Sequence, residues 1–514
     1  MSRYRRFLAL PLAAVVALAM AVPVAAAPKG TLERYARDTW RSFVHLVDPT
    51  TGLPADNISG SLKGTTRSAY TSPTNIGMYF WASLAARDLG FIGGDEATAR
   101  IATTLTTLEG MDRHEPSGQF WNWYSPRTGE VLTTWPEPPN NPVTPFASSV
   151  DNGWLASGLL MIANAVPELH DRAWDLATSM DFGCYYDPNA KGPDAGAGLI
   201  RGGFWLTPQG GSVPGDYCGM GETVQYTGHH YGSFNTEPRI ASYIGIALDQ
   251  IPEEHYFGGW RTFPDTCDWS WPETKPIGVW REYLGVDVFE GAYPYDDQLV
   301  VPTWGGSMFE ALMVPLVVPE EEWGPDSWAV THPLYVESQI EYGLDEAAYG
   351  YWGFSPSSNP AGGYREYGVD VLGMDTAGYT SDVDRLTSIE SGWDDPACYR
   401  APQSITGYGQ GVVTPHAACL ALDFDPEAAL TNLANLASDF PGLYGRGGFK
   451  DAVNVATGQV ADRYLALDQG MVIAAIANVL THDQLQGYLA TTLQPSLQPL
   501  MEMEQFGAGR VGAP

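Results

Sequence analysis

Apolar residues recur at helical spacing in a dozen segments of the chain. In the first half this pattern predicts helices over residues 31–47, 74–90, 96–111, 151–166 and 171–182. In the second half it predicts helices over residues 237–250, 307–318, 327–343, 411–424, 426–440, 466–480 and 482–493. Asp425 before Pro426 is typical of a helix N-cap followed by a first-turn proline. Strand-like stretches are short and confined to loops such as residues 197–208.

About a dozen helices without regular β alternation predict an all-α fold. Their number fits a ring of six helix hairpins, an (α/α)6 toroid, formed as a single domain over residues 28–514. Residues 185–232, 256–303 and 355–408 are expected to be long loops, and aromatic residues recur in all three. We therefore expect these loops to be ordered over a cleft, as loops that build a site on a rigid scaffold are.

The N-terminal residues have the pattern of a secretory signal peptide. Arg3, Arg5 and Arg6 precede an apolar run from Phe7 that ends in small residues at about position 27. We expect residues 1–27 to be removed, which places the mature protein outside the cytoplasm, secreted or in the periplasm or cell envelope. A retained membrane anchor is the weaker alternative, because prolines interrupt the run and a polar chain follows it.

Without residues 1–27 the chain has 24 Lys and Arg residues against 60 Asp and Glu residues, a net charge of −36. Such a surface repels phosphate backbones and anionic membranes, so nucleic acid is not an expected partner and no membrane span is expected in the mature protein. Five cysteines leave at least one thiol free. Cys419 lies in an apolar run and is expected to be that buried thiol, and two candidate disulfides, whose pairing the sequence does not fix, are Cys184 with Cys218 and Cys267 with Cys398.

An acidic residue stands at the start of the apolar segment over residues 237–250. Ile240, Tyr243, Ile244, Ala247 and Leu248 form one helical face, and Glu237 lies three residues before Ile240 on that face. Its carboxylate is therefore expected at the edge of the buried side. An acid there also interacts favourably with the helix dipole, by about 0.3 to 1 kcal/mol, which is a purely structural interpretation. For Glu237 to act as a general acid, burial must raise its pKa against that dipole.

Other chemistries have little support in the sequence. We find no G-x-S-x-G motif of a serine hydrolase, and the glycines near residue 409 do not follow a convincing strand, as those of a nucleotide site would. No cysteine pair has the spacing of a zinc site, and the histidines do not cluster. We therefore expect no metal and no cofactor.

Nine segments in collinear order resemble one family. They include TSPTNIGMYFWASLAARDLG, SSVDNGWLASGLL, NTEPRIASYIGIALDQIPEEHYF, WGGSMFEALM, YGYWGFSPSSNP, YGRGGFKDAVN and DRYLALDQGMV. Over about residues 70 to 480 the chain resembles the glycoamylase-like domain of bacterial endo-β-1,2-glucanases and of the central domain of cyclic β-1,2-glucan synthase. Nine collinear blocks are far more specific than a single short motif.

The resemblance implies an (α/α)6 toroid that acts on a β-linked glucan, with Glu237 as the catalytic acid. In the synthase branch a second glutamate follows the WG-x-S block, where this chain has Pro356. Because a retaining mechanism needs two carboxyl groups about 5 Å apart, this substitution favours an inverting hydrolase. The resemblance then implies Asp451 as the base, with Asp151 and Asp468 as alternative carboxylates. Asp151 also has the position of an ordinary helix cap.

Further residues are candidates for contact with the sugar. Aromatic rings can stack on pyranose faces, and charged or polar groups can bind hydroxyls, although each residue can equally be structural. Glu310, in the middle of an apolar helix, is either such a residue, a support for the acid or part of an ion pair. The candidates are Trp121, Trp123, Tyr124, His229, His230, Arg239, Trp304, Glu310, Trp352, Arg365, Arg446 and Arg463.

The sequence therefore predicts a secreted glycoside hydrolase that cleaves β-glucan, with β-1,2-glucan as the expected substrate, by inversion. Two alternatives are open. One is a glycosidase of the same superfamily with a different linkage, because the fold does not dictate linkage. The other is a non-catalytic carbohydrate-binding protein, which the proline at position 356 allows.

Overall fold

The computed structural model describes residues 29–217, 220–262, 276–374 and 408–511. The expected signal peptide and Cys218, Cys267 and Cys398 lie outside these residues. Cys184 is disulfide-bonded, and Cys419 is a buried free thiol, as predicted. No helix in the described ranges is long and apolar enough to cross a membrane.

The helices predicted in the first half of the chain are confirmed to within a few residues, except that the fifth ends four residues early. They are α1 (Lys29–Leu46), α2 (Pro73–Asp88), α3 (Gly94–Gly110), α4 (Ser149–Ala165) and α5 (His170–Thr178). Residues on every side of α2 and α4 are buried, whereas α3 buries one face. This difference separates helices inside the fold from helices at its periphery.

The described residues of the second half form eight α-helices. α6 is short and begins after Glu237, α7 and α10 are shorter than predicted, α8 was not predicted, and α13 continues ten residues beyond its predicted end. Five buried leucines, at positions 485, 489, 493, 497 and 500, form one stripe along α13 and hold it past two exposed prolines. The helices are α6 (Arg239–Ala247), α7 (Met308–Leu312), α8 (Glu320–Trp323), α9 (Trp328–Glu341), α10 (Pro415–Leu420), α11 (Pro426–Asp439), α12 (Ala466–Thr481) and α13 (Gln484–Met503).

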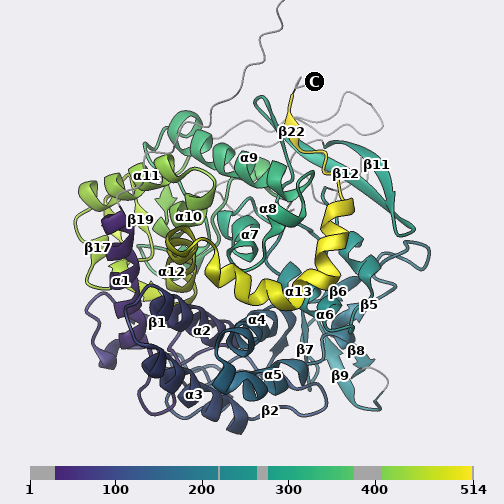
Figure 1. Ribbon diagram of the computed structural model, residues 1–514, viewed down its shortest axis with the longest axis horizontal. Helices are drawn as coiled ribbons and strands as arrows, with labels where there is room; N and C mark the ends of the chain where they lie inside the picture. Colours follow the sequence, from purple (N-terminus) through teal and green to yellow (C-terminus); the bar gives the residue numbers. More distant parts are fainter. Residues whose placement is uncertain (1–28, 218–219, 263–275, 375–407, 512–514) are drawn as a thin grey trace, which may run out of the picture.

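The helices are arranged around a ring (Figure 1). α2, α4, α6, α7, α10 and α12 lie nearer its centre, and α1, α3, α5, α9 and α11 lie nearer the periphery. Neighbouring inner helices pack closely where a glycine removes the side chain. A Cβ added at Gly77 of α2 would lie 2.4 Å from the carbonyl oxygen of Trp154 in α4, and one at Gly153 would lie 3.0 Å from the Cβ of Ala241 in α6. These contacts fix Trp154 relative to both neighbouring helices.

Part of the fold prediction is not confirmed, because the described residues form eight small sheets besides the helices. Two sheets have four strands: β4 (Ala147–Ser148), β7 (Gly203–Trp205), β9 (Thr223–Tyr226) and β8 (Val213–Asp216); and β11 (Ile277–Tyr283), β12 (Val286–Tyr295), β13 (Gln298–Val300) and β22 (Gly509–Arg510). Two have three: β10 (His230–Tyr231), β6 (Leu199–Arg201) and β5 (Tyr186–Asp187); and β16 (Val412–Val413), β19 (Val453–Asn454) and β20 (Gln459–Val460). The helical part of the prediction is confirmed, and a strictly all-α toroid is not.

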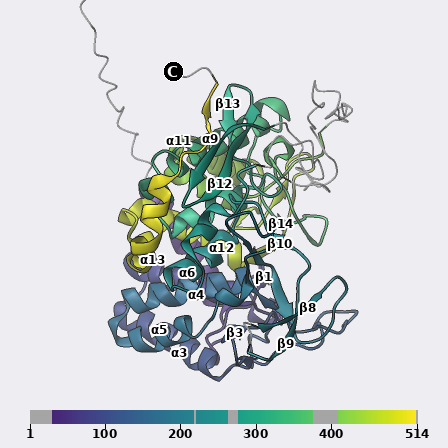
Figure 2. The same ribbon diagram turned by 90° about the vertical axis from the view of Figure 1, so that its right-hand side faces the viewer.

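Four antiparallel pairs complete the strands. They are β1 (Asn57–Ser59) with β21 (Arg463–Leu465), β2 (Arg113–His114) with β3 (Gln119–Phe120), β14 (Ser357–Ser358) with β15 (Tyr364–Arg365), and β17 (Tyr444–Gly445) with β18 (Gly448–Phe449). In Figure 2 the helices α5, α6 and α13 lie to the left, and the strands β1, β8, β10 and β14 lie to the right. The predicted loops 185–232 and 256–303 thus contain strands, and several of them gather on one side of the ring.

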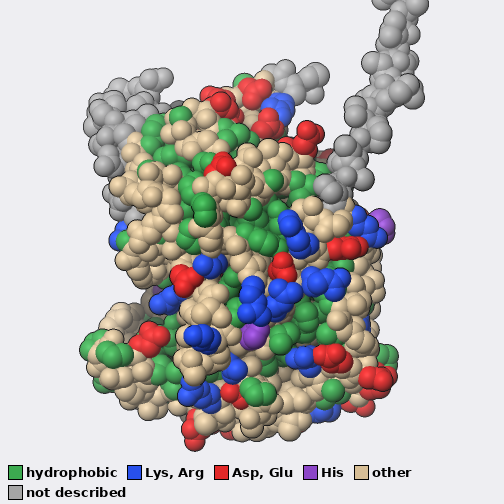
Figure 3. All heavy atoms as spheres, turned by 90° about the vertical axis from the view of Figure 1, so that its left-hand side faces the viewer, with side chains coloured by type: hydrophobic (Ala, Val, Ile, Leu, Met, Phe, Trp, Pro, Cys, Tyr) green, Lys and Arg blue, Asp and Glu red, His purple; other side chains and the backbone are tan. Residues whose placement is uncertain are grey.

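The face in Figure 3 carries many Lys and Arg side chains, although the whole chain is strongly acidic. Arginines of α1 and nearby segments pair with carboxylates: Arg41 with Asp38 at 2.8 Å and Arg67 with Asp48 at 3.3 Å. Both pairs are partly buried. These carboxylates partly neutralise the two arginines.

Candidate active site

A cavity of about 600 Å³ contains the residues that carry chemistry. Its size falls in the range of small-molecule sites. Its walls come from α2, α4, the turn before α6, the β1–β21 pair and the β14–β15 hairpin. The lining residues are Asp56, Asn57, Tyr70, Ser72, Thr74, Asn75, Trp123, Trp135, Glu137, Val150, Asp151, Glu237, Ser358, Gly363, Tyr364, Arg463, Leu465 and Leu467.

Glu237 lies in a turn two residues before α6, and not in the first helical turn that the pattern predicted. The helix N-cap is Pro238, which makes no side-chain cap. The side chains of Asn235 and Thr236, which precede the helix, have other partners: the Asn235 amide donates to the carbonyl oxygen of Val301 at 3.1 Å, and the Thr236 hydroxyl donates to Glu310. Hydrogen bonds to Val301 and Glu310 in neighbouring segments therefore hold this turn, and no side chain of the turn caps α6.

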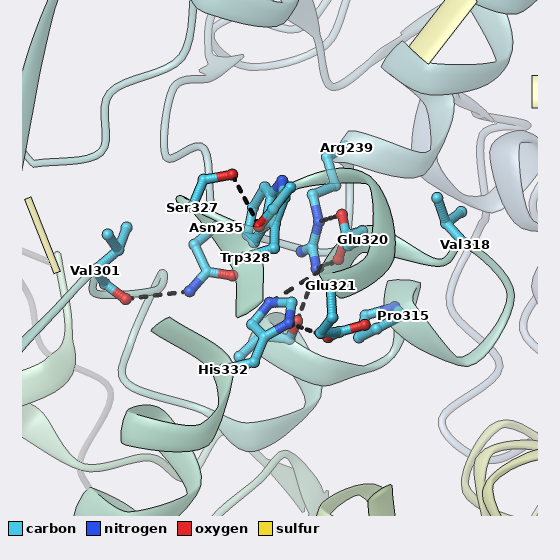
Figure 4. Close-up of polar contacts among 12 residues, drawn as sticks. Asn235, Arg239, Val301, Pro315, Val318, Glu320, Glu321, Ser327, Trp328 and His332 are labelled. Atoms are coloured by element: carbon cyan, nitrogen blue, oxygen red, sulfur yellow. Dashed lines mark hydrogen bonds and ion pairs between the residues drawn. The ribbon is translucent and has the colours of Figure 1, made fainter. Parts of the chain in front are cut away.

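The Arg239 side chain fixes the turn that carries Glu237 through several hydrogen bonds (Figure 4). Its Nε and Nη2 donate to the two carboxylate oxygens of Glu320 at 2.7 and 2.8 Å. Its Nη1 donates to the carbonyl oxygens of Thr236 at 2.9 Å and Glu310 at 3.0 Å. Arg239 is 4% exposed and does not line the cavity. This predicted sugar-binding residue is a buried clamp in the structure.

The environment of the Glu237 carboxyl favours its protonated form. Its Oε2 accepts a hydrogen bond from the indole Nε1 of Trp154 at 2.8 Å, which favours the charged form. Burial, followed by the charge of Glu310, outweighs that bond and raises the pKa of Glu237 well above its ordinary value. The direction is the one that a general acid requires.

Glu310 lies directly behind Glu237. Its Oε2 accepts the Glu237 backbone N–H at 2.9 Å as well as the Thr236 hydroxyl. Burial raises the pKa of Glu310 to about 7, against those two hydrogen bonds. Glu310 does not line the cavity, so its contacts support the turn that carries Glu237.

Asp151 lies on the cavity wall in the first turn of α4. Ser148, and not Asp151, caps the helix, because its Oγ accepts the Asp151 backbone N–H at 3.2 Å. The Asp151 carboxylate accepts from the Thr74 hydroxyl at 2.6 Å and from the Asn122 amide at 2.9 Å. These bonds hold the Asp151 carboxyl group on the same cavity as Glu237.

Asp451 and Asp468 lie together beneath the cavity, 3% and 2% exposed. With His416 they place one ligand-type atom each within 4.8 Å of one another. Burial and the charge of Asp468 raise the pKa of Asp451 well above its ordinary value, and burial raises the pKa of Asp468 to about 6. The two predicted carboxylates therefore form one coupled pair.

The β14–β15 hairpin connects this pair to the cavity. Ser358 pairs with Tyr364 across the hairpin, and its backbone N–H donates to Asp451 Oδ2 at 2.6 Å. Both Ser358 and Tyr364 line the cavity. Desolvation of the Tyr364 phenol, and then the charges of Asp468, Asp451 and Glu237, raise its pKa. The phenol thus experiences the predicted acid and the predicted base together.

Three aromatic rings form one part of the cavity wall. Tyr70 lies with its ring centre 5.7 Å from that of Trp123 and 4.4 Å from that of Trp135, and the two indoles are 5.8 Å apart. Trp123 was predicted from the sequence, whereas Tyr70 and Trp135 were not. Such flat, partly exposed rings can stack on the C–H faces of sugars.

Of the other predicted sugar-binding residues, only Arg463 lines this cavity. Trp121, Tyr124 and Trp352 are buried in the core. His230 binds Asp187 at 3.0 Å in the β5–β6–β10 sheet, and Arg446 is exposed beside α1, where its carbonyl oxygen accepts from Arg41. Of the remaining candidates, His229, Trp304 and Arg365 are at least partly exposed outside the lining, and Arg463 lines the cavity.

Several lining residues had no signal in the sequence. Asp56, Tyr70 and Trp135 lie in irregular segments outside the nine collinear blocks, and Tyr364 lies in a short hairpin beside the predicted Arg365. Tyr70 directly precedes the block that begins at residue 71, which is the one hint of its position. Together the cavity holds a carboxyl poised to donate a proton, carboxylates that can accept one, and an aromatic wall.

Two family models match the chain. One, described as "Putative glucoamylase", matches residues 274–489, and one for a protein of unknown function, DUF3131, matches residues 34–183. The cyclic beta-(1,2)-glucan synthase NdvB of Rhizobium meliloti is 24% identical over 561 aligned positions, which cover 88% of this chain and 18% of that protein. The chain therefore spans less than a fifth of the length of this curated relative.

Solved structures share the fold. An endo-beta-1,2-glucanase from Chitinophaga pinensis, in complex with sophorotriose and glucose, superposes with a TM-score of 0.62 at 16% identity, covering 92% of this chain and 98% of that one. A "putative glucoamylase" from Bacteroides caccae superposes with a TM-score of 0.62 at 18% identity, covering 94% of this chain and 100% of that one. These comparisons confirm the resemblance to the glycoamylase-like family that the nine blocks indicated.

Proposed function

We propose that the protein is a glycoside hydrolase that cleaves β-glucan, with β-1,2-linked glucan as its substrate. The observation that carries this proposal is Glu237, a carboxyl with a strongly raised pKa on the wall of a cavity that also holds Asp151 and three clustered aromatic rings. Hydrolysis of a glycosidic bond needs a proton donor such as Glu237 beside the bound sugar, together with a proton acceptor for the attacking water.

In this proposal Glu237 donates its proton to the leaving glycosidic oxygen, directly or through a bridging hydroxyl or water. The Trp154 indole and the Glu310 carboxylate hold its side chain and its backbone. As the proton leaves, the Trp154 hydrogen bond stabilises the carboxylate that forms. A general acid held in this way contributes roughly 10² to 10⁴ in rate.

Asp451 is the proposed base, which accepts a proton from the attacking water. The Ser358 backbone N–H fixes one of its oxygens, and Oδ1 has no hydrogen-bond partner among the described residues. The hairpin that carries Ser358 also lines the cavity. A base and an acid that act on opposite sides of the sugar with water between them give inversion.

The β-1,2 linkage rests on the named relatives. The Chitinophaga protein is an endo-beta-1,2-glucanase with sophorotriose in its complex, and NdvB is a cyclic beta-(1,2)-glucan synthase. A panel of glucans with different linkages tests this specificity. We also propose that residues 1–27 direct export, so that the enzyme meets glucan outside the cytoplasm.

The test is to incubate the protein with linear β-1,2-glucan and a panel of other β-glucans and to measure new reducing ends. We expect product with β-1,2-glucan and an α anomer at early times by NMR. The Glu237→Gln variant should lose at least about 10²-fold in kcat while keeping its circular dichroism spectrum. Binding without product across the whole panel would instead identify a carbohydrate-binding protein, and an early β anomer would exclude inversion.

A further inference from the structure

The buried carboxylates of Asp451 and Asp468 lack compensating charge. Three of their four oxygens, Asp451 Oδ1 and both oxygens of Asp468, have no hydrogen-bond partner among the described residues. Within the same residues neither carboxylate forms an ion pair with Lys or Arg, and His416, 3.5 Å from Asp468 by Nδ1 to Oδ2, is the sole basic side chain paired with either. Two buried negative charges without a counterion are too costly to persist, so the pair must hold a cation or a proton.

The protonation state of His416 bears on whether the Asp451–Asp468 pair holds a cation or a proton. The Thr414 hydroxyl donates its single hydrogen to the carbonyl oxygen of Asp451 at 2.6 Å. Thr414 Oγ1 must therefore accept from His416 Nδ1, 2.8 Å away, so Nδ1 carries a hydrogen. On the other side, Nε2 lies 2.9 Å from Ser355 Oγ, which itself accepts the backbone N–H of Phe309. Ser355 donates its hydrogen to Nε2 if the ring is neutral, and accepts from Nε2 with its second lone pair if the ring is charged.

Burial lowers the pKa of His416 to about 4, so the ring is neutral at neutral pH. With Nδ1 donating to Thr414 and Nε2 accepting from Ser355, both nitrogens are then occupied. The ring has no free lone pair for a metal ion, and it carries no charge to offset the carboxylates. A shared proton between Asp451 and Asp468 is what remains.

We propose that Asp451 and Asp468 share one proton and act together as the base of the reaction, a carboxyl–carboxylate pair with a net charge of −1. This inference deepens the proposed function and rests on it. In the step, the pair takes a proton from water and becomes neutral, and the water oxygen forms the new bond to the anomeric carbon. The bond from that carbon to the glycosidic oxygen breaks, and Glu237 gives its proton to that oxygen. Solvent then returns the proton from the pair to Glu237.

Other titratable groups face the pair from each neighbouring element. They are His416 of α10, Tyr364 of β15 and Asp56 next to β1, and Arg463 of β21 acts on Asp56. The charge of Asp56 opposes ionisation of Asp468, and the neutral phenol and imidazole add no charge. Asp468 is thus a positioning residue: it acts on the substrate through Asp451.

The first test detects the shared proton by infrared spectroscopy and does not depend on catalytic activity. Infrared difference spectra of protein labelled with ¹³C-aspartate at neutral pH should show a protonated-aspartate band that disappears in both Asp451→Asn and Asp468→Asn. Asp297→Asn, which changes an exposed aspartate with a side chain 70% exposed, is the matched control and should leave the band unchanged. A band that survives in Asp468→Asn would show an independent acid and overturn the pair. Stoichiometric metal in the purified protein would overturn it as well.

The second test uses the pH profile. The wild-type protein should lose kcat/KM on acidification through about pH 6, where the pair takes its second proton. In Asp468→Asn the amide donates to Asp451 in place of the shared proton, so the acidic limb should move at least one pH unit lower. An unmoved limb with normal folding would overturn the role of Asp468. If no glucan is cleaved at all, the proposed function fails, and the infrared result still decides whether the pair shares a proton.

Discussion

The hydrogen bond from Trp154 to Glu237 sets the strength of the proposed acid. The bond favours the charged carboxylate, so it lowers the pKa of Glu237 against the larger effect of burial. In Trp154→Phe that bond is lost and the pKa rises further. Glu237 then keeps its proton to higher pH, and the basic limb of kcat/KM, measured on β-glucan, should move to higher pH.

Trp81→Phe is the matched control for this prediction. Trp81 is as fully buried as Trp154 and packs edge-on against it with ring centres 5.5 Å apart. Its Nε1, unlike that of Trp154, has no hydrogen-bond partner in the described part of the chain. Trp81→Phe should change the stability of the protein without moving the basic limb of the kcat/KM profile. Equal shifts in both variants would show that packing, and not the hydrogen bond, tunes Glu237.

Residue-level prediction from the sequence succeeded where a side chain belongs to a patterned helix or a collinear block. Glu237 and Asp151 follow this rule, and both reach the cavity wall. Tyr70, Trp135 and Tyr364 reach it from irregular segments or a short hairpin, where no periodicity indicates direction. Arg239 shows the opposite failure: an arginine beside the acid resembles a ligand-binding residue, but its guanidinium points to Glu320.

At the scale of elements, the ion pair between Arg239 and Glu320 joins α6 to α8. Glu320 is fully buried and also accepts the Tyr243 hydroxyl at 2.8 Å. Glu320→Gln leaves the Arg239 charge buried without its counterion, which should cost about 3 kcal/mol in the free energy of unfolding. Urea denaturation measures this loss.

Glu322→Gln, on the same short helix but exposed, provides the control and should change stability by less than about 0.5 kcal/mol. Because Arg239 also holds the carbonyl oxygens of Thr236 and Glu310, Glu320→Gln should lower kcat as well. If Glu320→Gln is as stable as Glu322→Gln, the ion pair between Arg239 and Glu320 does not stabilise the contact between α6 and α8.

The helices were predictable because each buries a stripe or a whole surface whose spacing is visible in the sequence. The sheets were not, because most of their strands have two to four residues, too few to show alternation. The pairing of β1 with β21 also joins segments about 400 residues apart, which no local pattern encodes. Since these strands and hairpins carry part of the cavity wall, the site was less predictable than the helical frame.

On the scale of the whole molecule, buried titratable groups make stability depend on pH in both directions. Burial lowers the pKa of His255 and His416 to about 4, so the stability that their neutral forms provide is present above their ordinary value of about 6.5 and is lost as the pH falls. Burial, followed by the charge of Glu504, raises the pKa of Glu290 to about 8. That contribution is present at low pH and is lost as the pH rises towards 8. The buried histidines and the buried carboxyl group therefore act on stability in opposite directions.

Glu290 is the group to test on the alkaline side. It lies 3.9 Å from Arg261, measured from Oε2 to Nε, but the Arg261 guanidinium bonds to Glu504. Glu290→Gln removes the titrating carboxyl and keeps its shape. Between pH 6.5 and 8 the wild-type protein should lose up to about 1.4 kcal/mol per pH unit relative to the variant. Urea midpoints at the two pH values measure this difference, which also cancels the titration of every other group. Parallel pH curves for the two proteins would show that Glu290 is ionised throughout this range and that Arg261 neutralises both glutamates.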